Sequence, residues 1–161
     1  MSCRRLMSAA VVVAAAAGWG GVATADMSRT LIAAFRGELV ITKGDLPEGK
    51  NEKDTIAKIK TERLKELTGE ARDDVMHWRF HYTAFLTKTG ATRLKMEFYI
   101  NDKDKKFVAD NRLDGVDPKT PVLSGDISIN EDEGLSKGKP YIIKLVTDND
   151  VVVASTALVM K

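Results

Sequence analysis

The sequence predicts a mainly β fold, an antiparallel β-sandwich of about seven strands with one inserted amphipathic helix. Three observations predict it. Apolar and polar residues alternate with a period of two over residues 76–86 and 94–100, turn residues recur at short intervals from residue 87 to residue 150, and one Lys- and Glu-rich segment has a helical period instead. Many short strands separated by turns are typical of a sandwich.

The first elements of the fold are a strand and the inserted helix. Residues 36–42 form the opening strand. The apolar side chains of residues 51–68 fall within one narrow arc of a helix. These side chains are Ile56, Ile59, Leu64 and Leu67. Asn51 or Asp54 caps the start and Gly69 marks the end. We expect this helix to pack over an open end or edge of the sandwich.

Two neighbouring segments carry the clearest strand pattern. On the more apolar face of residues 76–86 lie Trp78, Phe80, Tyr82, Ala84 and Leu86. In the next segment the apolar face holds Leu94, Met96, Phe98 and Ile100. Both apolar faces are predicted to lie in the core. The turn over residues 87–91 either closes a hairpin or arches from one sheet to the other, and the sequence leaves both possibilities open.

The remaining strands are shorter and follow one another closely. We expect a short strand at 107–109 and a loop at 110–121, in which Gly115, Pro118 and Pro121 interrupt any regular element. Further strands are predicted at 122–129, 141–146 and 151–160. The last two are joined by Thr147-Asp148-Asn149-Asp150, residues that tolerate a positive φ.

A motif before the sixth strand carries a resemblance to a known fold. Leu135-Ser136-Lys137-Gly138-Lys139-Pro140-Tyr141 reads Leu-x-x-Gly-x-x-Tyr and leads into an alternating strand. It resembles the tyrosine corner of immunoglobulin-like and fibronectin type III-like sandwiches, and so implies that the Tyr141 hydroxyl bonds the backbone upstream. The chain departs from the antibody pattern, because it has no cysteine pair and Trp78 lies on the second strand. An immunoglobulin-like topology implies no particular activity.

The first 25 residues have the pattern of a cleavable signal peptide. Arg4 and Arg5 precede an uncharged stretch that runs to Ala25 and ends in small residues. We expect cleavage near Ala25 and a secreted or periplasmic protein. A retained membrane anchor is the alternative, but three glycines interrupt the apolar run. The arginine pair also leaves twin-arginine export open beside the general route.

Residues 26–161 are expected to form one sandwich domain. Removal of Arg4 and Arg5 from the 25 basic residues leaves 23, against 23 acidic ones. A neutral chain lacks the basic footprint that nucleic acids require. The single cysteine, Cys3, leaves with the leader, which excludes a disulfide and a thiolate site in the exported part. We expect no stable membrane insertion after cleavage.

No pattern of catalytic or metal-binding residues stands out. His77 and His81 would share a metal on a helix, but on a strand they are about 13 Å apart, at roughly 3.3 Å per residue. The acidic clusters lack the spacing of a calcium loop, and the serines lack a nucleophile elbow. We therefore expect no cofactor, no metal and no enzymatic activity. The alternatives are a small hydrolase using carboxylates of residues 110–117 and a calcium-stabilised adhesion domain.

The outward faces of the second and third strands are the candidate contact surface. Phe85 and Tyr99 alternate with charged residues, and we expect them to be exposed. The surface comprises Arg79, His81, Phe85, Arg93, Lys95 and Tyr99. In the competing interpretation these aromatic side chains are buried under the inserted helix. The resulting functional hypothesis is an exported, non-catalytic binding or structural module whose partner is an envelope or extracellular protein or a glycan.

Overall fold

The structure is a computed structural model that describes residues 27–161. The predicted leader, residues 1–25, lies outside the described residues. The elements in chain order are α1 (Arg29–Ala34), β1 (Leu39–Thr42), α2 (Glu52–Glu62), β2 (Glu66–Leu67), β3 (Glu70–Arg72), β4 (Val75–Phe85), β5 (Arg93–Ile100), β6 (Phe107–Asp114), β7 (Val122–Asn130), the 3₁₀ helix η1 (Glu131–Glu133), β8 (Pro140–Thr147) and β9 (Val152–Met160).

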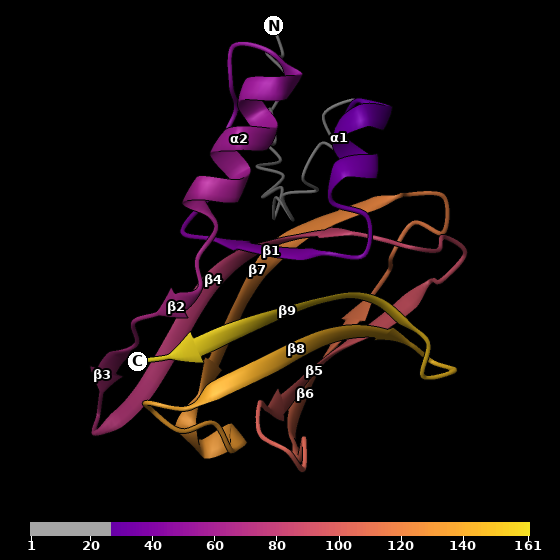
Figure 1. Cartoon of the computed structure of the whole chain (residues 1–161). Coiled ribbons are helices and arrows are strands. Elements are labelled where there is room, and N and C mark those ends of the chain that lie inside the picture. The colour runs from indigo at the N-terminus through magenta and orange to yellow at the C-terminus, as the bar shows by residue number, and fades with distance from the viewer. Residues whose placement is uncertain (1–26) are drawn as a thin grey trace, which may run out of the picture.

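The strands form two sheets that face each other (Figure 1). In the first sheet β4 pairs with β1 and β3 on one side and with β7 on the other. The second sheet has the order β2-β9-β8-β5-β6, and its main strands are antiparallel. Apart from the short β2 and β3, seven strands remain in residues 27–161. Of these, β1, β4 and β7 form one sheet, and β5, β6, β8 and β9 form the other. This is an immunoglobulin-like sandwich, and the predicted fold class is confirmed.

The connection between β4 and β5 settles the question that the sequence left open. The two strands belong to different sheets, so the segment between them is an arch and not a hairpin. Its backbone is held by the neighbouring loop, because the Leu86 N–H donates to the Pro121 carbonyl at 2.9 Å and the Gly90 N–H to the Pro118 carbonyl at 2.7 Å. Gly90 has φ +104°, a value that glycine adopts without strain.

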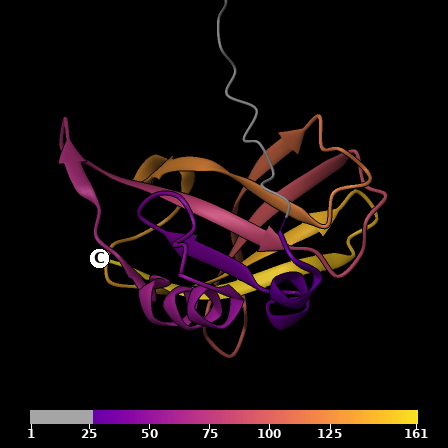
Figure 2. The same cartoon turned by 90° about the horizontal axis from the view of Figure 1, so that it is seen from above.

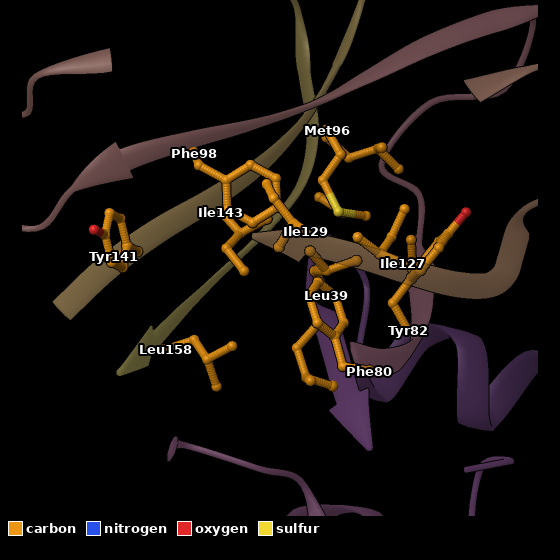
Figure 3. Close-up of a cluster of buried hydrophobic side chains, with 14 of the residues drawn as sticks. Leu39, Phe80, Tyr82, Met96, Phe98, Ile127, Ile129, Tyr141, Ile143 and Leu158 are labelled. Carbon is orange, nitrogen blue, oxygen red and sulfur yellow. The ribbon is translucent and has the colours of Figure 1, made fainter. Parts of the chain in front are cut away.

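The main core lies between the two sheets. From the first sheet Phe80 and Tyr82 point inward, and they meet Met96 and Phe98 from the second (Figure 3). Trp78 of the first sheet belongs to the same cluster. All five are buried, which confirms the predicted inward faces of β4 and β5. The Trp78 Nε1–H also donates to the Lys161 carbonyl at 3.1 Å, so its one polar group is satisfied.

A second, smaller core lies on the outer side of the first sheet. Both helices stand there (Figure 1, Figure 2), and their apolar side chains pack on outward-facing residues of the sheet. Its buried members are Leu31, Phe35, Val40, Ile59, Phe85 and Val122. The four residues of β1 are therefore all buried, because one face of this strand meets the main core and the other meets the helices. None of the helices among residues 27–161 is long and apolar enough to cross a membrane.

Helix α2 corresponds to the predicted inserted helix but is shorter at its C-terminal end. Asn51 caps it as expected, since its side chain accepts a hydrogen bond from the Asp54 N–H at 3.0 Å. The helix ends at Glu62 and not at residue 68, because the chain then turns to follow other strands. The Leu64 N–H donates to the Ile41 carbonyl, and Leu67 pairs with Met160 of β9.

Two further elements differ from the predicted ones. Helix α1 was not expected, and it displaces the start of the opening strand from residue 36 to Leu39. Strand β6 continues to Asp114, although a loop was predicted from residue 110. The reason is tertiary, because residues 110–114 form an antiparallel ladder with Arg93–Glu97 of β5 despite their charged side chains.

Candidate functional site

The predicted contact surface is divided between the two sheets. Arg79, His81 and Phe85 lie on the outer face of β4, in the first sheet. Arg93, Lys95 and Tyr99 lie on the outer face of β5, in the second. These faces point away from each other, so the six residues do not form one patch. A single surface required the two strands to share one sheet, and the arch between them places them in different sheets.

Phe85 is not exposed, contrary to the prediction. Its side chain is 0% accessible, and its ring packs against Phe35 with a centroid separation of 5.2 Å. The competing interpretation, burial under the helix, is correct for this residue. A signal was present in the sequence, because helix residues such as Ile59 need an apolar surface to cover and the outer face of β4 offers Phe85.

His81 is also buried, with 6% of its surface accessible, so it offers no open contact surface. Its Nδ1 lies 3.3 Å from Oδ1 of Asp126, the residue directly opposite on β7. On its other side Thr42 of β1 is opposite and buried as well. The His81 side chain therefore lies between two polar residues, Thr42 on β1 and Asp126 on β7. Of the predicted residues on β4, only Arg79 is exposed.

Tyr99 lies on the outer face of the second sheet within a fixed set of contacts. Its hydroxyl donates to Oε2 of Glu97 at 2.7 Å, and Nζ of Lys144 lies 4.3 Å from its ring centroid. Nζ of Lys95 is 3.4 Å from both Glu97 Oε1 and Asp150 Oδ1. The hydrogen bond to ionised Glu97, with some burial, raises the pKa of Tyr99 to about 12. Contacts therefore engage both the hydroxyl and one face of the Tyr99 ring.

An apolar row crosses this face from strand to strand. Tyr99 lies opposite Phe107 of β6 and Ile142 of β8, and Ile142 lies opposite Ala157 of β9. We call these four residues the outer-face row. The rings of Tyr99 and Phe107 meet edge to face with centroids 5.7 Å apart, and Phe107 remains 48% exposed. The sequence pattern did not single out Phe107, because residues 107–109 were expected to form only a short strand.

The contacts of Tyr99 allow a prediction about the pKa of its hydroxyl. In the variant Glu97→Gln the hydroxyl keeps an oxygen acceptor but loses the negative charge, so we expect the pKa of Tyr99 to fall from about 12 toward its ordinary value of 10. Phenolate absorbance against pH, compared with Tyr99→Phe, measures it. Tyr82, whose pKa burial also raises to about 12, serves as the internal control and should not move. A Tyr99 that titrates near pH 10 in the wild type would contradict the assignment.

Two hollows lie beside the arch between β4 and β5. The larger, of about 690 Å³, lies beside α1 and carries Arg29, Arg36 and Lys88 on its wall. None of the described residues that line it is acidic. The smaller, of about 380 Å³, includes Asp148, which pairs with Arg93 at 3.3 Å. Neither hollow brings two carboxylates together.

The acidic residues proposed for a hydrolase or a calcium site are distributed over a strand and separate turns. Asp110 and Asp114 lie on strand β6 and not in a loop. Asp117 accepts a hydrogen bond from the Lys119 N–H, and Asp102 accepts from the N–H groups of two following residues. Within residues 27–161 no group of three or more His, Cys, Asp or Glu side chains lies close enough together to hold a metal ion.

The fold and the outer face together define an immunoglobulin-like β-sandwich with one sheet covered by helices and one sheet open. No family model matches the sequence, and no curated protein matches it. Solved structures give weak similarities. A β-glucosidase from Kluyveromyces marxianus has 10% identity and a TM-score of 0.31, over 60% of this chain and 14% of that chain.

The same enzyme in complex with glucose has 9% identity and a TM-score of 0.33 over the same shares of the two chains. The CARDB domain of a Pyrococcus furiosus protein, solved in complex with di-metal ions, has 12% identity and a TM-score of 0.32. That match covers 78% of this chain and 90% of the other. The chain therefore spans only 14% of the β-glucosidase chains. At such TM-scores the similarities assign no activity, and the fold assignment rests on the strand order.

Proposed function

We propose that the protein is an exported, non-catalytic binding module that holds a protein partner on the outer face of the second sheet. The leader of residues 1–25 is the segment that would direct it out of the cell interior. The single observation that carries the proposal is the Phe107 ring, 48% exposed and packed edge to face on an oriented Tyr99. A large aromatic side chain at the centre of a contact supplies most of its binding energy.

The surroundings of the outer-face row have the composition of an interface. The row itself is apolar or aromatic, and charged side chains of both signs flank it. These are Lys95, Glu97, Asp110, Arg112 and Lys144. A hydrophobic centre with a polar rim is the usual anatomy of a protein contact. The contacts of Tyr99 with Glu97 and Lys144 favour one rotamer before binding, which would reduce the rotamer entropy lost when the partner binds.

A protein fits this face better than a glycan. Sugar rings stack on an open aromatic face and exchange hydrogen bonds with nearby polar groups. Here Lys144 covers one face of Tyr99 and Glu97 takes up its hydroxyl. What remains accessible is the Phe107 ring and the apolar side chain of Ile142, which suits the apolar side chains of a protein.

The proposal is tested by placing a photo-reactive amino acid at position 107 of the full chain in its native host. After irradiation we expect one adduct that contains a second, different protein. Position 151 is the matched control, because Val151 is also exposed, at 38%, but lies in the β8–β9 turn. It should give no such adduct. The absence of an adduct with a different protein at 107, or the same adducts at both positions, would contradict the proposal.

The identified partner then allows a quantitative check. Phe107→Ser should weaken its binding at least about tenfold, as expected for the loss of a central aromatic contact. Val151→Ser should leave the binding unchanged. The melting temperature of both variants should stay near that of the wild type, because both side chains are exposed.

A further inference from the structure

Strand β6 is an edge of the second sheet. Within residues 27–161 it pairs with β5 alone, so one side of its backbone lacks a strand partner. Exposed edges of this kind pair with other chains unless something blocks them. β6 contains neither proline nor lysine. Two features could block pairing at the free edge, the irregularity in the β5–β6 ladder near Phe107 and the approach of the Gly134 backbone to Val108. Both affect only the first residues of the strand.

The charges along β6 are unfavourably placed within one chain. Asp110 lies directly opposite Glu97 of β5, and Arg112 lies directly opposite Lys95. Like charges in such positions repel each other. Lys95 and Glu97 pair with one another and with other groups. Among the described residues Asp110 and Arg112 take part in no ion pair.

A second copy of β6 supplies the missing charges. If two strands run antiparallel about a two-fold axis at Asn111, Asp110 of each copy lies opposite Arg112 of the other. The inward-facing Ala109 then lies opposite Leu113, so apolar side chains meet on the core side. A register centred on Asp110 places two aspartates opposite each other, and one centred on Arg112 places two arginines opposite each other. The charges therefore select the register at Asn111.

We propose that two copies of this chain associate through antiparallel pairing of their β6 strands, centred on Asn111. Each dimer then has one continuous sheet, in which the outer faces of both copies lie on the same side. The inference rests on the backbone edge and the charges of β6 and not on the proposed function, although Phe107 of the outer-face row is the first residue of the same strand. Because the added contacts are backbone hydrogen bonds and exposed ion pairs, association should depend on concentration and weaken in high salt.

Charge exchange tests the register. Molecular mass is measured by sedimentation equilibrium on the purified protein over a range of concentrations. Arg112→Asp places carboxylates of the two copies opposite each other, and Asp110→Arg places two guanidinium groups there, so each variant should dimerise at least about tenfold more weakly. The double variant Asp110→Arg/Arg112→Asp restores opposite charges and should dimerise like the wild type. An equimolar mixture of the two single variants should form mixed dimers.

These variants separate association from folding. Arg112→Asp faces Lys95 within its own chain and Asp110→Arg faces Glu97, so both remove a repulsion inside the monomer. Their melting temperatures at low concentration should equal or exceed that of the wild type. Lys119→Asp, a charge reversal at an exposed loop position, is the matched control and should leave association unchanged.

A covalent trap checks the geometry. In a Cys3→Ser background, Asn111→Cys places two thiols across the two-fold axis, where opposed Cα atoms are about 4.5–5.5 Å apart, within reach of a disulfide. Mild oxidation should link the two copies, whereas Asp102→Cys, in the turn before β6, should stay reduced. A wild type that remains monomeric at every soluble concentration would overturn the proposal. So would dimers that resist all the charge variants and leave Asn111→Cys unlinked.

Discussion

Replacing Phe85 by alanine is expected to lower the free energy of unfolding by about 3–5 kcal/mol, the usual cost of removing a fully buried phenylalanine ring. The ring is inaccessible to solvent, packs against Phe35, and belongs to the second core together with Val40 and Val122. The helices cannot close the resulting cavity without losing their own contacts with the sheet. Urea denaturation followed by circular dichroism measures the loss.

Phe107→Ala is the matched control for Phe85→Ala. It removes the same atoms from a ring that is 48% exposed, so its cost should stay below about 1 kcal/mol. The pair of variants therefore reports which outward-facing phenylalanine belongs to a core and which belongs to a surface. Equal losses at the two positions would show that the helices do not cover the first sheet.

Replacing Tyr141 by phenylalanine is expected to lower the free energy of unfolding by about 1–3 kcal/mol, although only one oxygen atom is removed. The Tyr141 side chain is 1% accessible, and its hydroxyl accepts a hydrogen bond from the Ser136 N–H at 2.7 Å. This is the contact that the Leu-x-x-Gly-x-x-Tyr motif implies. Without the oxygen the Ser136 N–H loses its partner in a partly buried place.

Tyr99→Phe is the corresponding control for Tyr141→Phe. It also removes one hydroxyl, but the Glu97 side chain that accepts from this hydroxyl keeps Lys95 as a partner, at 3.4 Å. Its cost should be the smaller of the two, and chemical denaturation under identical conditions compares them. If Tyr141→Phe costs less than about 0.3 kcal/mol, the hydroxyl has no structural role and the motif match is accidental.

The sequence by itself determined the local features of this protein. The alternation in β4 and β5 identified Trp78, Phe80 and Phe98 as inward-facing, because a strand turns successive side chains to opposite sides. Asn51 was one of the two predicted caps, and the hydroxyl contact of Tyr141 was also predicted correctly, since both contacts join residues only a few positions apart.

Only the tertiary structure decided which surfaces are free. The sequence placed Phe85 and Tyr99 on equivalent outward faces, yet helices cover the first and leave the second open. The end of α2 and the length of β6 were likewise decided by distant strands, β9 and β5. The physical reason is that strand pairing and burial depend on partners far along the chain. The periodicity of the sequence shows only how the side chains of a strand are divided between its two faces. An alternating strand therefore shows which side chains share a face, and the partner elements determine which face meets solvent.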